Sequence, residues 1–354
     1  MRPWHASVAT LLAIATPAMQ DPTPPSRAPS APSDTVEDPY RWLEDVLGER
    51  ALDWVRARNA DSKRQLADSE LFEPLQARIL SILDSDERIA YVHKRGEHYY
   101  NLWQDQDNPR GLWRRTTWAS YAAGDPQWET VLDLDQLGRD EGENWVWKGS
   151  TWLTPGYDRC LLSLSRGGAD ATVVREFDPV AKEFVRDGFA LPEAKTQVAW
   201  CDRDTLFVGT DLGEGSMTQS GYPRIVKRWR RGTPIAAAET VAEGEPEDIY
   251  VYGYRDLTAG FERDFVFRGI TFFSNEVFVV RDGELVRIDK PDSANADVHR
   301  EWLLFELRDD WQIGGQHYAA GSLLVTRFDA YLRGERQFDV LFAPTERSSL
   351  AGWS

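Results

Sequence analysis

The chain has 354 residues, of which 42% are hydrophobic and 28% are charged, a composition typical of a folded globular protein rather than a disordered one. Its formal net charge of −17 at pH 7 argues against nucleic acid or an anionic membrane as a partner, because phosphate groups need a basic surface. The most basic run, Arg224 to Arg231, has an alternating pattern that predicts the outer face of a strand.

Residues 1–18 predict a secretory signal peptide. Arg2 lies near the start, a short apolar run follows from Ala6 to Ala15, and the small residues around Pro17 offer an imperfect cleavage site. An unstructured leader is the alternative. Residues 19–36 are rich in Pro, Ser and Thr, which predicts a linker. We therefore expect a periplasmic or secreted protein.

Residues 37–85 predict a helical segment. Asp38 and Pro39 suit a helix start, and a second helical period runs from Leu71 to Leu83. Gly48 interrupts the first period, so two shorter helices are expected to meet there. The first helical stretch carries one apolar stripe with a 3.6-residue period, formed by Leu43, Val46, Leu47, Ala51, Trp54 and Val55.

From residue 86 to 354 the pattern is that of short strands separated by turns. A strong two-residue hairpin signal is Asp282-Gly283, and further turns are expected at Arg95-Gly96, Gly167-Gly168, Gly314-Gly315 and Arg333-Gly334. The strands fall into about five groups, spaced roughly every 45–55 residues, which is the size of a four-stranded propeller blade. These groups begin at Ile89, Trp145, Val198, Ile249 and Val298. A large β-sandwich is the alternative on periodicity alone.

No metal site is expected. The two cysteines, Cys160 and Cys201, form no CxxC pair and predict two separate buried thiols rather than a zinc site or a disulfide. Asp133 and Asp135 imitate the start of a calcium loop, but Leu137 and Asn144 occupy positions that must coordinate the ion. A solvated acidic connection is expected there instead.

The stretch DPYRWLEDVLGERALDWVRARN resembles the N-terminal segment of the prolyl oligopeptidase family of serine peptidases. The resemblance continues through SDERIAYVHKRGEHYYNLW, ENWVWKG, LSRGGADATVVREFD and GSMTQSGYPRIVKRW, and covers the chain from Glu37 to its end. It implies a seven-bladed propeller that caps an α/β-hydrolase domain, with the N-terminal helices packed on the hydrolase domain. The fold class expected here is therefore mainly β: about five of seven blades of an incomplete propeller, preceded by helices.

The chemistry of that family requires a serine on a G-x-S-x-G elbow, with a histidine and an aspartate. The chain contains no complete G-x-S-x-G; the nearest approach is Gly352-Trp353-Ser354 at its end. None of the five histidines has such a serine as a partner. We therefore expect no catalytic residue in this chain, and no cofactor is implied.

Tyr222 and Arg224 are the candidate substrate-lining residues. They join a loop of small polar residues to a strand, and an arginine fork suits a peptide carboxylate. A well-packed connection within a blade is the alternative.

Two functions remain open. The resemblance implies the N-terminal part of a serine peptidase that hydrolyses short peptides, with the propeller as a substrate-size filter and a C-terminal hydrolase domain that this chain lacks. The alternative is a non-catalytic, propeller-like binding module or a gene remnant. An open arc of blades argues against this alternative, because its end strands and the helical stripe would be exposed.

Overall fold

The computed structural model describes residues 38–353. The predicted signal peptide and linker lie outside these residues. The chain divides into two compact units, residues 1–78 and 79–354. In the described part, no helix has the length and apolar character needed to cross a membrane.

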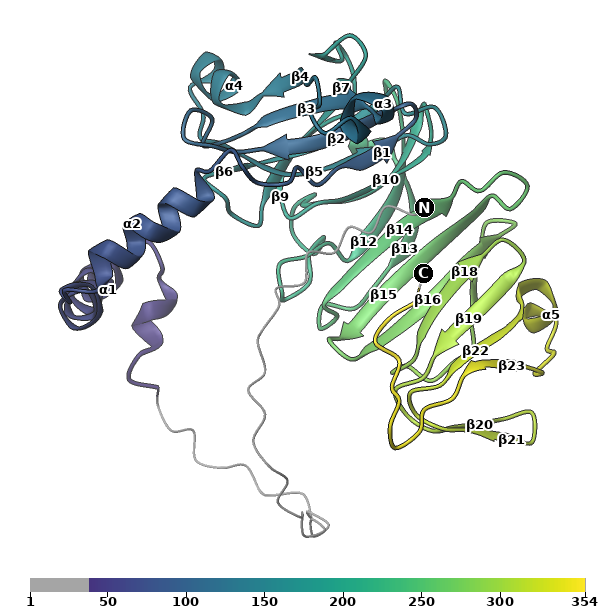
Figure 1. Cartoon of the computed structure of the whole chain (residues 1–354). Coiled ribbons are helices and arrows are strands. Elements are labelled where there is room, and N and C mark those ends of the chain that lie inside the picture. The colour runs from purple at the N-terminus through teal and green to yellow at the C-terminus, as the bar shows by residue number, and fades with distance from the viewer. Residues whose placement is uncertain (1–37, 354) are drawn as a thin grey trace. The chain divides into compact units, whose positions relative to one another are not determined.

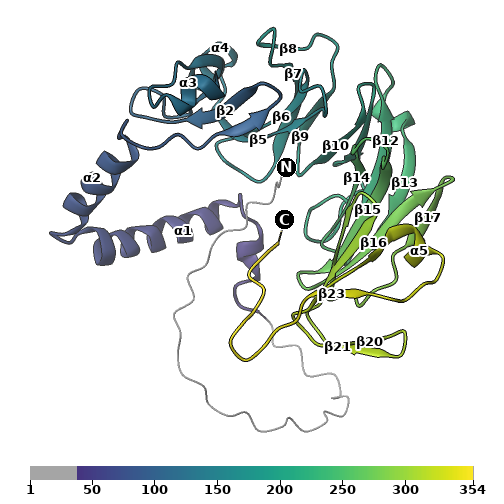
Figure 2. The ribbon, with the colours of Figure 1, turned by 45° about the vertical axis from the view of Figure 1, so that its right-hand side comes forward.

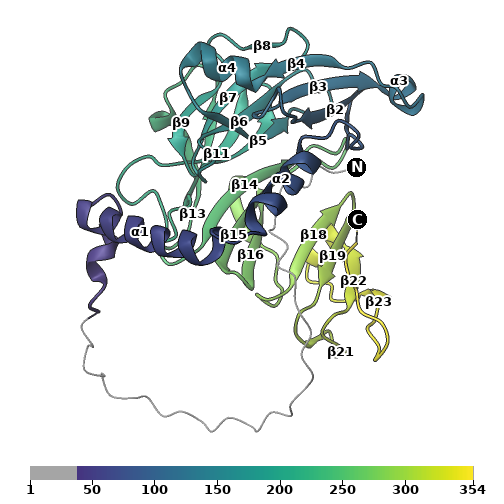
Figure 3. The ribbon, with the colours of Figure 1, turned by 60° about the vertical axis from the view of Figure 1, so that its left-hand side comes forward.

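The first unit is helical where it is described (Figure 3). As expected, the helical period breaks at Gly48, which caps α1. Trp42, in the short helix before the break, packs edge-on against Trp54 with ring centroids 6.3 Å apart. The helical elements are a 3-10 helix (Arg41–Glu44), α1 (Glu49–Ser62), a π-helical turn (Lys63–Ala67) and α2 (Phe72–Leu83), which crosses into the second unit.

The apolar stripe of this helical segment is unevenly covered. Ala51 is 5% exposed, whereas Val46 and Leu47 are 71% and 83% exposed. Trp54 and Val55 are about half-exposed. Amphipathic helices gain most of their stability by burying such a stripe.

The described part of the second unit contains five consecutive antiparallel sheets of four or five strands, together with one separate two-stranded hairpin (Figure 1). Each of these five sheets is one blade, and the blades begin close to the five positions expected from the sequence. The strands of blade 1 are β1 (His93–Arg95), β2 (His98–Trp103), β3 (Leu112–Thr117) and β4 (Glu129–Asp133). Blade 2 has β5 (Trp145–Trp152), β6 (Cys160–Arg166), β7 (Thr172–Asp178), β8 (Glu183–Phe184) and β9 (Ala190–Ala194), which also pairs with β7.

The remaining three blades follow the same plan (Figure 2). Blade 3 has β10 (Gln197–Asp202), β11 (Thr205–Gly209), β12 (Ile225–Arg230) and β13 (Glu239–Glu243). Blade 4 has β14 (Tyr250–Asp256), β15 (Arg263–Thr271), β16 (Ser274–Arg281) and β17 (Glu284–Arg287). Blade 5 has β18 (Asn295–His299), β19 (Trp302–Glu306), β22 (Leu323–Arg327) and β23 (Asp339–Phe342).

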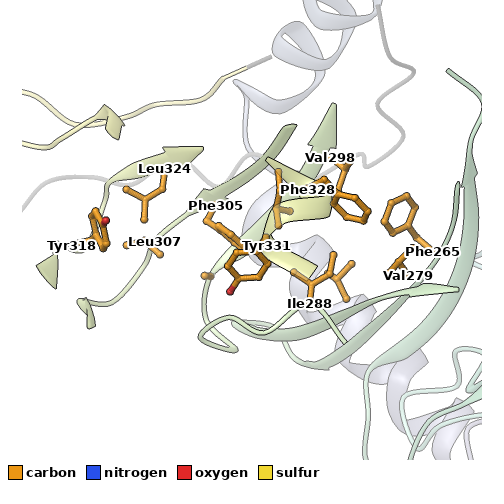
Figure 4. Packing of buried hydrophobic residues seen from close by; sticks show 13 residues of the cluster. Phe265, Val279, Ile288, Val298, Phe305, Leu307, Tyr318, Leu324, Phe328 and Tyr331 are labelled. Carbon is orange, nitrogen blue, oxygen red and sulfur yellow. The ribbon is translucent and has the colours of Figure 1, made fainter. Parts of the chain in front are cut away.

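Four buried clusters join the five blades in chain order. Tyr100 and Trp113 of blade 1 share one cluster with Cys160 of blade 2, and similar clusters lie between blades 2 and 3 and between blades 3 and 4. Figure 4 shows the largest of them, in which Phe265 of blade 4 packs edge-on against Phe328 of blade 5, with ring centroids 6.1 Å apart. In the part of the chain that the structure describes, none of these clusters joins blade 1 to blade 5. The blades therefore form an incomplete propeller, as expected.

The two-residue turns follow the sequence signals. Arg281 pairs with Glu284, and Asp282 and Gly283 between them have φ of 50° and 83°, as the predicted hairpin turn requires. The turn at Gly167-Gly168 also lies between β6 and β7 as expected.

Three local predictions were wrong or incomplete. The first group of strands was expected to begin at Ile89, but β1 begins at His93. Gly314-Gly315 does not simply separate two blade strands but closes an added hairpin, formed by β20 (Trp311–Ile313) and β21 (Gln316–Tyr318).

The third correction concerns the acidic connection at Asp133, which is helical. Asp133 caps α4 (Leu134–Glu141), because its side chain accepts a hydrogen bond of 2.8 Å from the backbone N–H of Gln136. Asp135 accepts hydrogen bonds from the backbone N–H groups of Arg110 and Gly111. Two further short helices are α3 (Trp118–Ala122) and α5 (Phe328–Leu332), and Ile235–Ala237 is a 3-10 turn.

Both cysteines are free and buried, in agreement with the prediction of separate thiols. Cys160 lies in the cluster between blades 1 and 2, and Cys201 lies in the cluster between blades 3 and 4. Burial raises the pKa of both thiols, that of Cys201 to about 12.

Candidate functional site

The polar loop that carries the candidate residues, residues 210–224 between β11 and β12, is tightly bonded. Ser216 and Thr218 are 3% and 5% exposed, although both are polar. The Ser216 hydroxyl donates to the carbonyl of Gly213 at 2.6 Å, and the Thr218 hydroxyl donates to the carbonyl of Ile249 at 3.1 Å. The second bond attaches the loop to the start of blade 4.

Arg224 holds this loop to the outer strand of its own blade. Its Nε donates to the carbonyl of Gly215 and its Nη1 to the carbonyl of Gly244, both at 2.7 Å. The same Nη1 lies 2.7 Å from the Glu243 carboxylate, and the Arg224 side chain is 16% exposed. The structure thus gives Arg224 a clear packing role, and its contact with a substrate stays a prediction.

The Tyr222 ring contacts two side chains from other segments of the chain, Lys195 and Tyr250. The Lys195 ammonium lies 4.3 Å from the centre of the Tyr222 ring, a cation–π contact. On another side, the ring packs edge-on against Tyr250 at the start of β14, with centroids 6.2 Å apart. Tyr222 and Arg224 therefore make different contacts, and Tyr222 touches a residue that lines a pocket.

The pocket that Tyr250 lines has a volume of about 160 Å³. It lies where β14 begins, where β15 turns into β16, and where β18 of the next blade begins. The residues that determine its character are Tyr250, Phe267, Phe272, Phe273, Asn275 and Arg308. With Asn295, which also lines the pocket, they combine an aromatic surface with two amides and one cation, which is the composition of many small-ligand sites.

The aromatic surface continues along blade 4 as a ladder of stacked rings. Tyr250 stacks on Phe267 with centroids 5.9 Å apart, and Tyr252 stacks on the same ring at 5.1 Å. Tyr254 stacks on Phe265 at 5.2 Å. Cross-strand aromatic pairs of this kind stiffen a sheet, so this wall of the pocket is preformed. Burial raises the pKa of Tyr250 and of Tyr252, so both phenols stay neutral at physiological pH.

The polar wall is centred on Asn275, which is 8% exposed. Its Nδ2 donates to the carbonyl of Ala294 at 3.3 Å, and its backbone carbonyl accepts a hydrogen bond of 2.7 Å from the buried Lys290 ammonium. Its Oδ1 is buried and has no hydrogen-bond partner among the described residues. Burial lowers the pKa of Lys290 to about 8.

Sequence reasoning missed this pocket. Its residues come from segments that are separate in the chain, and only the folded blades bring Tyr250, Asn275 and Arg308 together. One signal was present: Phe272 and Phe273 occupy the β15–β16 turn, where small polar residues are usual. Between residues 38 and 353 no group of three or more His, Cys, Asp or Glu side chains is arranged to hold a metal ion.

The fold and the interblade clusters define a propeller domain, and comparison with known proteins identifies its family. The family model described as "Prolyl oligopeptidase, N-terminal beta-propeller domain" matches residues 20–267. The chain therefore belongs to the prolyl oligopeptidase family and contains its N-terminal propeller domain.

Curated relatives extend this match beyond the family model. An uncharacterized peptidase from Sinorhizobium fredii is 35% identical over 92% of this chain and 46% of its own length. An uncharacterized peptidase from Rickettsia prowazekii is 29% identical over 86% of this chain and 45% of its own length. The chain thus spans about half the length of the curated relatives it matches.

Solved structures agree with the fold. A post-proline cleaving enzyme from Rickettsia typhi superposes with a TM-score of 0.79 at 28% identity, over 86% of this chain and 47% of that one. Oligopeptidase B from Leishmania major superposes with a TM-score of 0.61 at 15% identity, over 86% of this chain and 42% of that one. The second likeness supports the fold alone.

Proposed function

We propose that this chain is the N-terminal part of a prolyl oligopeptidase-like serine peptidase that hydrolyses short peptides. The observation that carries the proposal is the match of residues 20–267 to the family's propeller domain, combined with peptidase relatives about twice as long. A likeness to a post-proline cleaving enzyme at 28% identity supports cleavage after proline.

The propeller is proposed to act as a filter for substrate size. Its blades are joined by buried clusters and by ion pairs such as Arg231 with Glu176 and Arg228 with Asp264, each pair linking residues of neighbouring blades. A wall stiffened in this way resists opening, so a folded protein would be held away from a site that it covers while a short peptide would reach it. This role needs the hydrolase domain as a partner.

The chemistry is proposed to reside outside this chain. Acyl transfer in this family uses a serine, a histidine and an aspartate, with no metal or organic cofactor, and the sequence from Met1 to Ser354 has no complete G-x-S-x-G. The chain alone is therefore proposed to be inactive. The signal-like residues 1–18 support a periplasmic or secreted location.

The test begins with the coding DNA beyond codon 354. If the frame continues into further blades and a serine elbow, the extended protein is produced beside the 354-residue chain, and both are assayed with a chromogenic peptide that carries proline before the cleaved bond. We expect the extended protein to cleave it and the variant with alanine at the elbow serine to fail. A verified stop codon, or an extended protein that is folded but inactive, would favour the non-catalytic binding module instead.

The filter is tested separately on the extended protein. A proline-containing peptide of about ten residues and the same sequence placed in an exposed loop of a folded carrier protein are offered at equal concentration. We expect cleavage of the free peptide only. Equal cleavage of both would contradict the filtering role without affecting the proposed chemistry.

A further inference from the structure

Arg308 is the cation of the pocket between blades 4 and 5. It follows the buried Leu307, the first residue after β19, and it is exposed. Across residues 38–353 it makes no ion pair, hydrogen bond or ring contact. Other arginines of this region are occupied, since Arg268 lies 2.7 Å from Asp248 and Arg287 lies 3.0 Å from Glu276. Arg308 is thus available to an anionic group, and a guanidinium fork matches a carboxylate best.

The apolar part of the pocket suits a side chain without charge. Phe272 and Phe273 at its rim are 84% and 72% exposed, which is unusual for adjacent large apolar residues in a turn. The Tyr250 ring lies over Gly269, where an added Cβ would come within 3.3 Å of the ring. This close approach keeps the ring flat against β15. A planar aromatic surface of this kind accepts a proline ring or another compact apolar side chain.

The polar wall contains an acceptor whose hydrogen-bonding capacity is unused among the described residues. The buried Oδ1 of Asn275 has no donor among the described residues, and an unsatisfied buried acceptor is stabilised by any donor that reaches it. The Nδ2 bond to Ala294 and the Lys290 bond to the backbone hold Asn275 in place from behind. The wall is therefore set before a ligand arrives.

We propose that this pocket binds the carboxyl-terminal end of a short peptide. The terminal carboxylate pairs with Arg308, the last side chain lies against Tyr250 and Phe267, and the Asn275 amide faces the peptide backbone. The inference rests on the proposed function in one respect, namely that short peptides are what the protein meets. Size filtering treats peptides with free and blocked carboxyl termini alike, whereas this pocket favours the free carboxyl terminus.

Glu306, whose carboxylate contacts the pocket residue Asn295, is already engaged. Glu306 accepts hydrogen bonds from Asn295 at 3.3 Å and from Trp353 at 3.4 Å through the same oxygen. These donors offset part of its negative charge, so the repulsion it exerts on a bound carboxylate is reduced. Because Arg308 is exposed, we expect an effect of about tenfold in affinity rather than the much larger effect of a buried pair.

The test measures binding to the 354-residue chain by isothermal titration calorimetry, so that no hydrolysis is needed. The probes are acetyl-alanyl-proline with a free carboxylate and the same dipeptide as its amide. We expect the acid to bind about tenfold more tightly than the amide, and R308Q to reduce the affinity for the acid to that for the amide. R186Q is the matched control, because Arg186 is an exposed arginine of blade 2 with no side-chain partner among the described residues.

A second variant separates the apolar contact from the charged one. The double variant F272S/F273S changes two exposed side chains, and we expect it to weaken the acid and the amide by the same factor. The inference is overturned if the two probes bind wild type equally, if the amide binds more tightly, if R308Q binds like R186Q, or if neither probe binds up to about 10 mM. Since the readout is binding by this chain, its failure is distinct from a failure of the extended protein to hydrolyse peptides.

Discussion

Glu176 is the residue whose replacement tests most directly how the blades are held together. It lies on β7 of blade 2, is 2% exposed, and accepts hydrogen bonds of 2.7 and 3.1 Å from Arg231, which follows the third strand of blade 3. The backbone N–H of Phe189 donates to the same carboxylate at 2.9 Å. The hydrogen bond with Glu176 is the main cause that raises the pKa of Arg231, so the guanidinium stays charged at neutral pH.

The loss in free energy of unfolding can be estimated from the contacts that Arg231 keeps after Glu176 is replaced. Removing one member of a fully buried pair costs about 3–5 kcal/mol, because it strands the other charge. Arg231 is 26% exposed and keeps Asp204 at 2.9 Å, so its charge is only partly stranded. For E176Q we therefore expect a loss of about 2–3 kcal/mol, which lowers the unfolding temperature by roughly 4–12 °C in a unit of this size.

The assay is a double-mutant cycle of E176Q and R231Q, measured by urea unfolding followed with tryptophan fluorescence. We expect a coupling free energy of about 1.5–2 kcal/mol between the two positions. The matched control is the half-exposed pair Arg166 and Glu193, 3.1 Å apart, for which about 0.5 kcal/mol or less is expected. A coupling at Glu176 no larger than that of the control would refute the view that this pair fastens blade 2 to blade 3.

Two further predictions concern buried titratable groups. Burial lowers the pKa of Lys290 from 10.5 to about 8. Between these two pH values the unfolded chain therefore binds more protons than the folded chain, so the folded state becomes more stable as the pH rises. Relative to K290M, we expect wild type to gain roughly 1–3 kcal/mol in free energy of unfolding between pH 8 and pH 10.5. A difference between the two proteins that does not change with pH would contradict this. Burial raises the pKa of Cys201 to about 12 and that of Cys160 well above its usual value, so both thiols should resist a disulfide reagent at pH 8 and react once the chain is unfolded in guanidinium. Rapid reaction of either thiol in the folded chain would show that its blade opens.

The repeat of the blades was predictable because turn residues that are close in the sequence determine where each strand ends. Asp282-Gly283 adopts the two positive φ angles that its hairpin needs, and the two glycines at 167 and 168 do the same between β6 and β7. Local sequence signals failed where a side chain bonds to an element other than the strand that contains it. The sequence around Asp133 predicts an acidic loop, yet Asp133 caps α4. The first residue of this helix, Leu134, is fully buried.

The candidate site was only half predictable for the same reason. Tyr222 and Arg224 stand out in the sequence as polar and aromatic residues after a small polar loop. The sequence does not reveal that Arg224 is held by Gly215 and Gly244, nor that Tyr222 meets Tyr250 of the next blade. Those contacts depend on how one blade packs on another, which turn signals and periodicity do not encode.

The measurement that tests the central claim most directly is labelling of the purified 354-residue chain with a fluorescent fluorophosphonate, alongside its hydrolysis of a peptide with proline before the cleaved bond. A chain that contributes the propeller but not the serine, histidine and aspartate should give neither labelling nor hydrolysis, and we expect an extended protein with a serine elbow to be labelled at that serine. Stoichiometric labelling of the 354-residue chain, with hydrolysis that the reagent abolishes, would contradict the account, because it would place an activated serine within these blades.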